Sequence, residues 1–254
     1  MEEASMKVSI IVPAYNEEKR ILKTLNDYYN TFNTMFGNNF ELIVEMDGCT
    51  DNTPEIVREF SRGKNNIRIL EFPKRLGKGG GIKEAFKIAN GEIIGFTDAD
   101  DSTPAKEFLK LIKEIENGYD VVLGSRWLKE SRVLIPQPLY RQILSRGFNL
   151  LVRIFFGLSI RDTQCGAKVF RKDVVDAVLS DLQVNGFAFD VELLYLAHKK
   201  GFRIKEVPIE WYNDKNSTLD VKKVVPEMFM ALVKVRLYHS PFKAIIKTSK
   251  LKGQ

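Results

Sequence analysis

The sequence predicts an α/β fold in which one mostly parallel sheet is covered by helices on both faces. Short apolar segments alternate with longer segments of helical periodicity along the first half of the chain. A length of 254 residues with 44% hydrophobic residues provides for one substantial core, so we expect a single domain. Acidic residues follow two of the apolar segments, at Asp47 and Asp98, where open parallel sheets bind their ligands.

The first half of the chain supplies five strands, each an apolar run of strand length. They are predicted at residues 7–12, 40–46, 67–72, 92–97 and 121–124. Between them lie segments of helical spacing, two of which begin at a proline, the residue preferred at a first helical position. These helices are predicted at residues 17–36, 54–62, 81–89 and 104–117.

The second half begins with a basic amphipathic segment. Residues 126–161 carry seven Lys or Arg against Glu130, and apolar residues recur at helical spacing, which predicts an amphipathic helix at about 138–157. Strands at 168–170 and 203–211 and helices at 189–200 and 222–238 complete a domain of residues 1–238. Residues 239–254 form a basic tail.

Net charge and hydropathy point to a membrane surface. The formal charge is +6, and Val221–Gln254 alone holds eight Lys or Arg against Glu227. No run of about 18 apolar residues occurs and the N-terminus lacks a signal peptide pattern, so we expect no membrane span. The basic helix and tail would instead bind anionic lipid, at about 1 kcal/mol per basic residue. A membrane-embedded partner subunit is the alternative.

Cysteine and histidine content excludes several classes of site. Cys49 and Cys165 have no zinc or redox spacing, and two cysteines fit a reducing cytosol. His198 and His239 exclude His-rich metal sites, and any nucleophile that depends on histidine would have to use one of them. Both lie beside basic residues, so we expect them on the surface.

Asp98-Ala99-Asp100-Asp101 follows an apolar strand directly. Alternate carboxylates at a strand end can reach one hard cation, and Mg²⁺ or Mn²⁺ can bridge a diphosphate. The alternative is helix capping by residues 101–103 before Pro104. Both interpretations hold together if Asp98 and Asp100 bind metal while the later residues cap.

Two further loops suit a nucleotide. Asp47 at a strand end would accept hydrogen bonds from a base or a ribose. The less favoured alternative is a turn at Asp47-Gly48 with a helix cap at Asp51. Residues 75–81, RLGKGGG, open a helix, where free N–H groups and Lys78 would attract an anion. The phosphate loop of kinase-type ATP sites is absent.

The motifs PAYNEE, DGCTDNT, RLGKGGGI, TDADDST, VVLGSRW, RDTQCGAKVF and FAFDVELLYLA occur in this order. Together they resemble family 2 inverting glycosyltransferases of the GT-A fold, within them the polyprenyl-phosphate sugar synthases, and most closely the dolichyl-phosphate β-glucosyltransferases. The resemblance covers roughly residues 7–238. It implies a Mg²⁺ or Mn²⁺ cofactor at Asp98 and Asp100, but Ser102 stands where mannosyl relatives have a third, glutamine contact. It further implies the nucleotide-binding residues Pro13, Tyr15, Glu17 and Asp47.

The same resemblance assigns an acceptor site. Arg126, Arg141 and Ser145 match the positions that hold the lipid phosphate in relatives. From spacing alone, the favoured interpretation of the helix with Arg141 and Ser145 is a core-facing helix with solvated arginines, and the resemblance reverses this preference. The sugar side would be formed by residues 161–166, with Asp162 and Gln164, and by residues 190–192, where only one of Asp190 and Glu192 faces the sugar or Asp190 caps a helix.

The expected reaction transfers a sugar, with glucose favoured, from a UDP- or GDP-sugar to dolichyl or polyprenyl phosphate with inversion, at the cytoplasmic membrane face. Its expected catalytic residues are Asp98, Asp100, Lys78, Asp162 and Gln164. The alternatives are a soluble glycan or polysaccharide acceptor, a nucleotidyltransferase, whose usual glycine-arginine loop is replaced by PAYNEE, and a non-catalytic membrane-binding or nucleic-acid-binding module. We expect no nucleic-acid partner.

Overall fold

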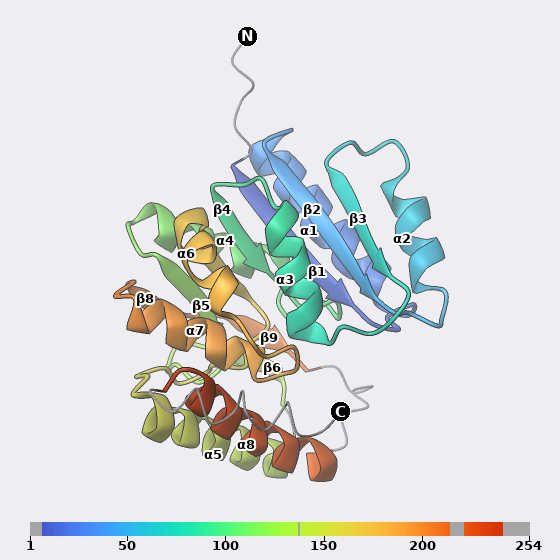
Figure 1. Ribbon diagram of the computed structural model, residues 1–254. Coiled ribbons are helices and arrows are strands. Elements are labelled where there is room, and N and C mark those ends of the chain that lie inside the picture. The colour runs from blue at the N-terminus through green and yellow to red at the C-terminus, as the bar shows by residue number, and fades with distance from the viewer. Residues whose placement is uncertain (1–6, 137, 214–220, 241–254) are drawn as a thin grey trace.

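The computed structural model describes residues 7–136, 138–213 and 221–240, and a seven-stranded sheet runs through its centre (Figure 1). In chain order the elements are β1 (Val8–Ala14), α1 (Ile21–Phe36), β2 (Phe40–Asp47), α2 (Thr53–Ser61), β3 (Ile67–Phe72), α3 (Lys78–Ile88), β4 (Ile93–Phe96), α4 (Ala105–Glu116), β5 (Val121–Ser125), β6 (Arg132–Ile135), α5 (Leu139–Phe156), β7 (Lys168–Arg171), α6 (Lys172–Val178), the 3₁₀ turn Leu179–Asp181, α7 (Phe189–Lys199), β8 (Ile204–Pro208), β9 (Glu210–Tyr212) and α8 (Val221–Tyr238).

The strand order is β3-β2-β1-β4-β7-β5-β8, and only β7 runs antiparallel to its neighbours. Val8 of β1 is in register with Phe40 of β2 on one side and with Ile93 of β4 on the other. Strand order therefore reverses at β1, and such a reversal opens a crevice beyond the carboxyl ends of the strands. The predicted fold class is confirmed.

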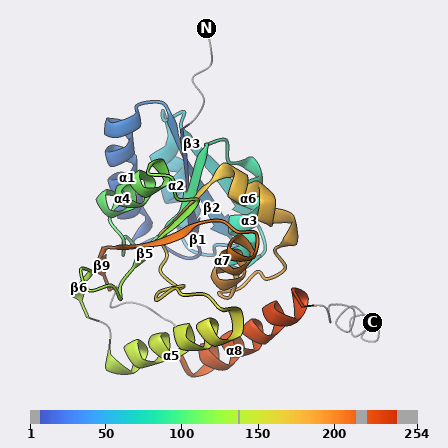
Figure 2. The same cartoon turned by 90° about the vertical axis from the view of Figure 1, so that its left-hand side faces the viewer.

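Side chains alternate between the two faces of the sheet and select which helices cover them. Ile10, Val12 and Val44 point to one face, where they pack with α1, α2 and α4. Ile11 and Ile43 point to the other face and pack with α3, α6 and α7. Figure 2 shows the sheet nearly edge-on, with α1 and α4 on one side and α3, α6 and α7 on the other.

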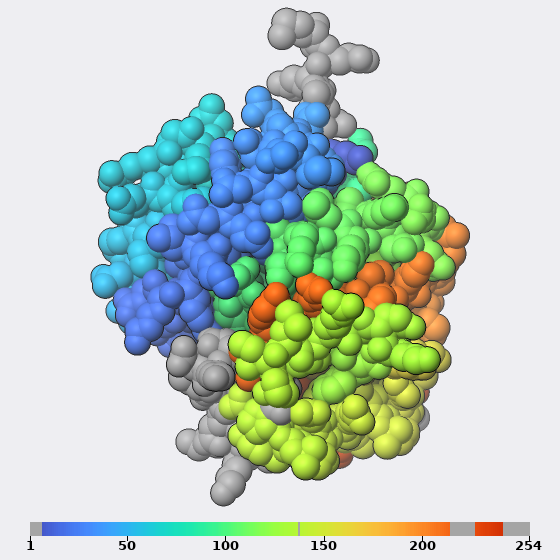
Figure 3. All heavy atoms as spheres, turned by 180° about the vertical axis from the view of Figure 1, so that it is seen from behind, coloured from blue at the N-terminus to red at the C-terminus, as the bar shows by residue number. Residues whose placement is uncertain are grey.

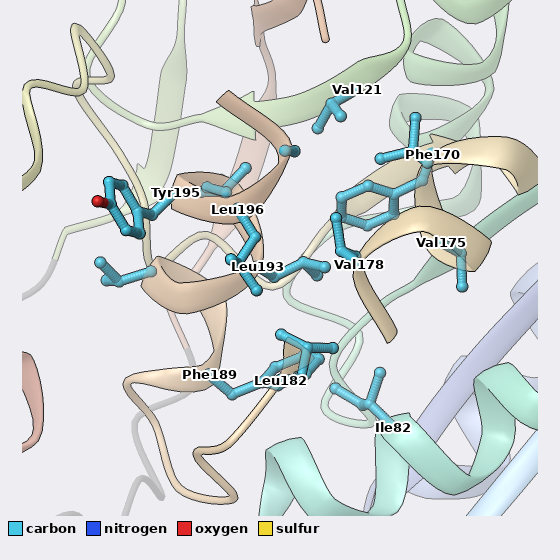
Figure 4. Packing of buried hydrophobic residues seen from close by; sticks show 14 of the residues in the cluster. Ile82, Val121, Phe170, Val175, Val178, Leu182, Phe189, Leu193, Tyr195 and Leu196 are labelled. Atoms are coloured by element: carbon cyan, nitrogen blue, oxygen red, sulfur yellow. The ribbon is translucent and has the colours of Figure 1, made fainter. Parts of the chain in front are cut away.

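Aromatic residues fill the core between the sheet and α7. The rings of Phe96 and Phe170 stack at 6.0 Å, and Phe189 lies 6.3 Å from Phe96. Figure 4 shows Phe170, Phe189, Val178 and Leu193 around this core. Complete burial of one such ring contributes roughly 2–3 kcal/mol, so this cluster fixes α7 against the sheet.

Two long helices lie apart from the sheet. Helices α5 and α8 run side by side below the carboxyl ends of the strands (Figures 1 and 2), and Phe155 contacts Phe229 with ring centroids 6.2 Å apart. Seen from behind, the yellow-green segment around α5 forms the lower part of the molecule (Figure 3). Among the described residues, no helix combines the length and apolar character needed to cross a bilayer.

Several boundaries differ from the predictions. Helix α1 begins at Ile21, because the backbone N–H groups of Glu17 and Glu18 donate to Thr53 and Asp51 and hold residues 17–20 outside the helix. The strand predicted at 203–211 is two strands, since Ile209 separates β8 from β9, which pairs with β6 in a second small sheet. Most of the predicted basic tail, residues 241–254, lies outside the described residues.

Candidate active site

A large cavity of about 1180 Å³ lies between the carboxyl edge of the sheet and the α5–α8 pair. Residues from the ends of β1, β2 and β4 line it on one side, and α5 and α8 line it on the other. Most of the predicted site residues line this one cavity: Pro13, Tyr15, Glu17, Asp47, Lys78, Asp98, Asp100, Arg126, Arg141, Ser145 and Gln164.

Asp98 and Asp100 form the acidic centre of the cavity. Lys78 Nζ lies 2.7 Å from Asp98 Oδ1. Gly166 lies against the same carboxylate, and a Cβ atom at this position would overlap the oxygens of Asp98. The glycine of the RDTQCGAKVF motif therefore makes room for the Asp98 side chain, which joins that loop to the end of β4.

The charges at this centre depend on one another. Burial opposes ionisation of Lys78, but Asp98, Asp190 and Asp100 outweigh it and raise the pKa of this lysine. Burial likewise opposes ionisation of Asp98, but Lys78 outweighs it and lowers the pKa of Asp98. Burial and the charge of Asp98 raise the pKa of Asp100. An additional cation would therefore stabilise the ionised form of Asp100 more than that of Asp98, which Lys78 already stabilises.

The chemistry of this pair fits a hard divalent cation. Asp100 Oδ1 accepts hydrogen bonds from Ser102 N and Oγ, so Ser102 orients the second carboxylate instead of supplying a third contact. Within the described residues, no group of three His, Cys, Asp or Glu side chains is placed to hold a metal. A cation held here would have two carboxylate ligands and would complete its shell with oxygens from substrate and water, which is typical of Mg²⁺.

The loop after β1 forms the neighbouring wall. The guanidinium carbon of Arg75 lies 3.5 Å from the ring centroid of Tyr15, and Glu17 forms an ion pair with Arg20. Asn16 has a left-handed backbone, with φ of 54°, and its side chain bonds to the backbone and hydroxyl of Thr50. Burial raises the pKa of Glu17, although the ion pair with Arg20 acts in the opposite direction. The hydrogen bonds between Asn16 and Thr50 tie the loop to the segment after β2.

Asp47 and the glycine-rich loop bond to each other, which corrects a prediction. The Asp47 carboxylate accepts hydrogen bonds from the backbone N–H groups of Leu76 and Gly77. The N–H groups of Gly79 and Gly80 donate to the carbonyl of Asn185. The prediction of free N–H groups for an anion is wrong at these four residues, and Asp47, although it lines the cavity, first serves to fix the loop.

The glycines themselves are explained by close packing. Added Cβ atoms would overlap Phe189 at Gly79 and Glu45 at Gly81.

Glu45 is fully buried two residues before Asp47, and neither of its carboxyl oxygens has a hydrogen-bond partner among the described residues. Burial, together with the charge of Asp47, raises the pKa of Glu45 to about 8. This carboxyl is therefore mostly protonated at neutral pH.

Arg126 and Asp162 form a buried ion pair. Arg126 Nε and Nη2 bond to the two carboxylate oxygens of Asp162 at 2.7 and 2.8 Å, and the backbone N–H of Arg126 bonds to the same group. The Asp162 side chain is fully buried and does not line the cavity, so the prediction that it faces the sugar is wrong. It instead positions Arg126, which lines the cavity and has further N–H donors beyond those bonded to Asp162.

The far side of the cavity is apolar. Arg141 and Ser145 are one helical turn apart on α5 and line the cavity together with Leu144, Phe148 and Leu151. Met228 and Phe229 of α8 continue this wall, as does Phe187. The cavity thus passes from carboxylates at the sheet edge, through arginines, to apolar side chains between the helices.

Part of the predicted sugar side lines the cavity. Gln164 lines the cavity, and its buried Nε2 has no acceptor among the described residues. Asp190 also lines it and pairs with buried Lys168 at 2.6 Å. Glu192 points elsewhere and bonds to the N–H groups of residues 183 and 184 and to His239. The surface prediction for His239 is wrong, because its side chain is 7% exposed beside Glu192.

Some lining residues received no site role from the sequence analysis. Among them are Arg20, Glu45, Trp211, Asn213, Met228 and Phe229. Trp211 lies on the short strand β9 and Met228 and Phe229 lie on α8, and their apolar character looked like ordinary core. Arg75 and Phe187 were noted only as members of the RLGKGGG and FAFDVELLYLA motifs.

Comparisons with known proteins agree with this geometry. The description "Glycosyl transferase family 2" matches residues 9–179. The dolichyl-phosphate beta-glucosyltransferase of Saccharomyces cerevisiae is 32% identical over 91% of this chain and 74% of its own length, and that of Homo sapiens is 32% identical over 84% and 69%. Glycosyltransferase AglD of Haloferax volcanii is 34% identical over 86% of this chain, which spans only 35% of that longer protein.

A solved structure shows the same fold. Glucosyl-3-phosphoglycerate synthase from Mycobacterium tuberculosis, in complex with UDP, superimposes with a TM-score of 0.71 at 19% identity over 92% of this chain and 81% of that one. At this identity the structural similarity shows the fold alone, and membership of the family is shown by the sequence matches. The chain therefore belongs to glycosyl transferase family 2 and is a glycosyltransferase with the GT-A fold.

Proposed function

We propose that this enzyme transfers glucose from UDP-glucose to a dolichyl or polyprenyl phosphate, with inversion and with the help of a divalent cation. The observation that carries the proposal is the single cavity that joins the Asp98–Asp100 pair to Arg126 and Arg141 and then to an apolar wall. A nucleotide sugar and a lipid phosphate need these three environments in this order. The names of the relatives support transfer of glucose to dolichyl phosphate.

The donor would lie at the sheet edge. Tyr15 and Arg75 offer a flat surface for the base, and Asp98 and Asp100 would hold Mg²⁺ or Mn²⁺ beside the diphosphate. A bound cation supplies charge neutralisation for the departing diphosphate. A synthase of the same fold has been solved with Mn²⁺ and UDP, which supports this class of ion.

The acceptor would enter from the α5–α8 side. Guanidinium groups bind phosphate through paired N–H donors, and Arg126 and Arg141 would reduce the repulsion between two phosphate-bearing substrates. One phosphate oxygen of the acceptor attacks the anomeric carbon while the bond from that carbon to the UDP oxygen breaks on the opposite face. The attacking phosphate dianion carries no proton, so this step needs no general base. Lys78 and Gln164 would orient the diphosphate and the sugar.

The enzyme would work at the cytoplasmic face of a membrane, held there by α5. The exposed side chains of Leu139, Ile143 and Ile154 lie on this helix, as do three of the arginines from the basic segment. A reducing compartment agrees with Cys49 and Cys165, which are both free.

Organic extraction tests the reaction. Purified enzyme, labelled UDP-glucose, polyprenyl phosphate and Mn²⁺ should give label in the organic phase, and EDTA should abolish it. Asp100→Asn keeps the shape but removes the charge and should reduce transfer by at least about 100-fold, the usual loss when one charge-stabilising group is removed. Label transferred to a soluble acceptor, with none in the organic phase, would support the alternative acceptor class and contradict the proposal.

A further inference from the structure

A second cavity, of about 340 Å³, lies outside the proposed donor and acceptor cavity. Three separate segments build it: Trp127 after β5, the α5 residues Arg146, Asn149, Leu150 and Arg153, and Arg161 in the loop after α5. None of these six residues lines the larger cavity. Because an α-helix has 3.6 residues per turn, Arg146 and Arg153 lie on a different side of α5 from Arg141 and Ser145.

The charge of this second cavity is uncompensated. Arg146, Arg153 and Arg161 have no carboxylate within ion-pair distance in the part of the chain that the structure describes. Two acids lie in or contact the loop after α5, Asp162 in the loop and Glu206 on β8, and both are already engaged. Asp162 pairs with Arg126, and Glu206 accepts the backbone N–H groups of residues 161 and 162. Three positive groups therefore surround one small space.

The walls of the cavity are fixed and rich in donors. The Arg146 guanidinium lies 4.8 Å from the Trp127 ring centroid, which orients its plane. Trp127 Nε1 is buried and has no acceptor among the described residues. Asn149 is held by two hydrogen bonds from Thr163, at 2.9 and 2.7 Å. Arginine forks and an unused indole N–H match a group with several acceptor oxygens, such as a phosphate.

An apolar stripe runs beside this cavity along α5. Leu139, Ile143, Leu150 and Ile154 are 71%, 61%, 57% and 70% exposed, at successive helical spacings of four, seven and four residues. Leu150 belongs both to the stripe and to the cavity wall. An apolar stripe flanked by arginines and a tryptophan is the arrangement of a helix that lies in a membrane interface. A free phosphate in water would gain nothing from the stripe.

We propose that the cavity formed by Trp127, Arg146, Arg153 and Arg161 binds the phosphate group of an anionic phospholipid while the α5 stripe enters the bilayer beside it. This site deepens the membrane part of the proposed function. It is distinct from the acceptor site, so the lipid bound here orients the enzyme and is not consumed. Planar guanidinium groups bind phosphate oxygens through paired N–H donors. The site therefore requires arginine at Arg146 and Arg161, and a positive charge alone is not sufficient.

Vesicle binding without turnover tests the site. The full-length protein is titrated with phosphatidylcholine vesicles that contain or lack phosphatidylserine. Arg146→Gln with Arg161→Gln should weaken binding to the serine-containing vesicles by about fivefold for each arginine, the effect of one basic residue near a charged surface. Arg146→Lys with Arg161→Lys keeps the charge but loses the planar fork and the stacking on Trp127, so it should also bind several times more weakly.

Arg62→Gln with Lys113→Gln, two exposed basic residues outside both cavities, is the matched control and should bind as the unchanged protein does. Wild-type affinity in the lysine variant, or an equal loss in the control, would show diffuse attraction and overturn the proposal. Inorganic phosphate is titrated in parallel. If it binds through Arg146 while vesicle affinity is the same in all variants, the lipid assignment is refuted.

A detergent assay separates this proposal from the proposed function. Arg161 was expected on the sugar side, but the structure places it, like Arg146, outside the larger cavity. The lysine variant should therefore keep its thermal midpoint and its transfer to detergent-solubilised polyprenyl phosphate. Loss of either would mean that the arginines serve the fold or the reaction, and would overturn the proposal. Absence of transfer in the unchanged protein would instead contradict the proposed function alone.

Discussion

Gly166→Ala is the sharpest test of the acidic centre. The added methyl group would overlap the Asp98 carboxylate, and only the end of that side chain needs to move to relieve the overlap. Normal contact requires a displacement on the order of 1 Å, and a misplacement of this size in a catalytic group costs about 100-fold in rate. The fold should be little affected, because the overlapping atoms belong to a side chain at the cavity surface.

The assay compares kcat/KM for transfer, Mn²⁺ affinity and thermal midpoint in Gly166→Ala and in Gly186→Ala. An added Cβ at Gly186 meets no atom within 4 Å, and this residue does not line the cavity, so the control should behave as the unchanged protein does. We expect the first variant to lose transfer and Mn²⁺ affinity together while its thermal midpoint stays near the control value. Transfer within threefold of the control, in place of the expected loss of about 100-fold, would refute the reasoning.

Three further predictions concern stability, measured by urea unfolding. Asp162→Asn leaves Arg126 as a buried charge without a counter-ion and should destabilise the fold by roughly 3–5 kcal/mol. A smaller loss of stability in the double variant with Arg126→Met would confirm the pairing. An equal or larger loss in the double variant would contradict it. Asn149→Ala removes the acceptor of two buried hydrogen bonds from Thr163 and should cost about 2–4 kcal/mol, whereas a loss under about 1 kcal/mol would contradict this role. Glu45 has a folded pKa of about 8, above its ordinary value of 4.5, so the unfolded chain loses this proton first and stability should fall as pH rises from 4.5 to 8. Glu45→Gln should remove roughly 3 kcal/mol of that fall between pH 5 and 7, and identical pH dependence in both proteins would contradict the assignment.

The central sheet was predictable because β1, β2, β4 and β5 are buried on both faces, so their sequences are apolar runs of strand length. Residues 67–72 were predicted and found as β3, and the Asp98 and Asp100 positions follow directly from the end of β4. Strands β6 and β9 were not predicted separately. They are four and three residues long and pair with each other from positions far apart in the chain, which local periodicity does not reveal.

The partners of charged residues were the less predictable part of the site. Asp162 and Asp47 looked like ligand groups because they are acids in recognisable motifs. Their actual partners, Arg126 and the backbone of residues 76 and 77, are 29 to 36 positions away along the chain. His239 looked like a surface residue because its neighbours in sequence are polar, but α8 brings it against buried Glu192. Such pairings are set by tertiary packing.

The proposed reaction depends most directly on where the cation and the acceptor phosphate bind. Crystals grown with Mn²⁺, UDP and a short-chain polyprenyl phosphate would locate the metal by anomalous scattering and the lipid phosphate in the same map. We predict the Mn²⁺ peak between the carboxylates of Asp98 and Asp100, and the phosphate between Arg126 and Arg141. A metal bound away from both aspartates, or a phosphate outside the large cavity, would contradict the proposed reaction.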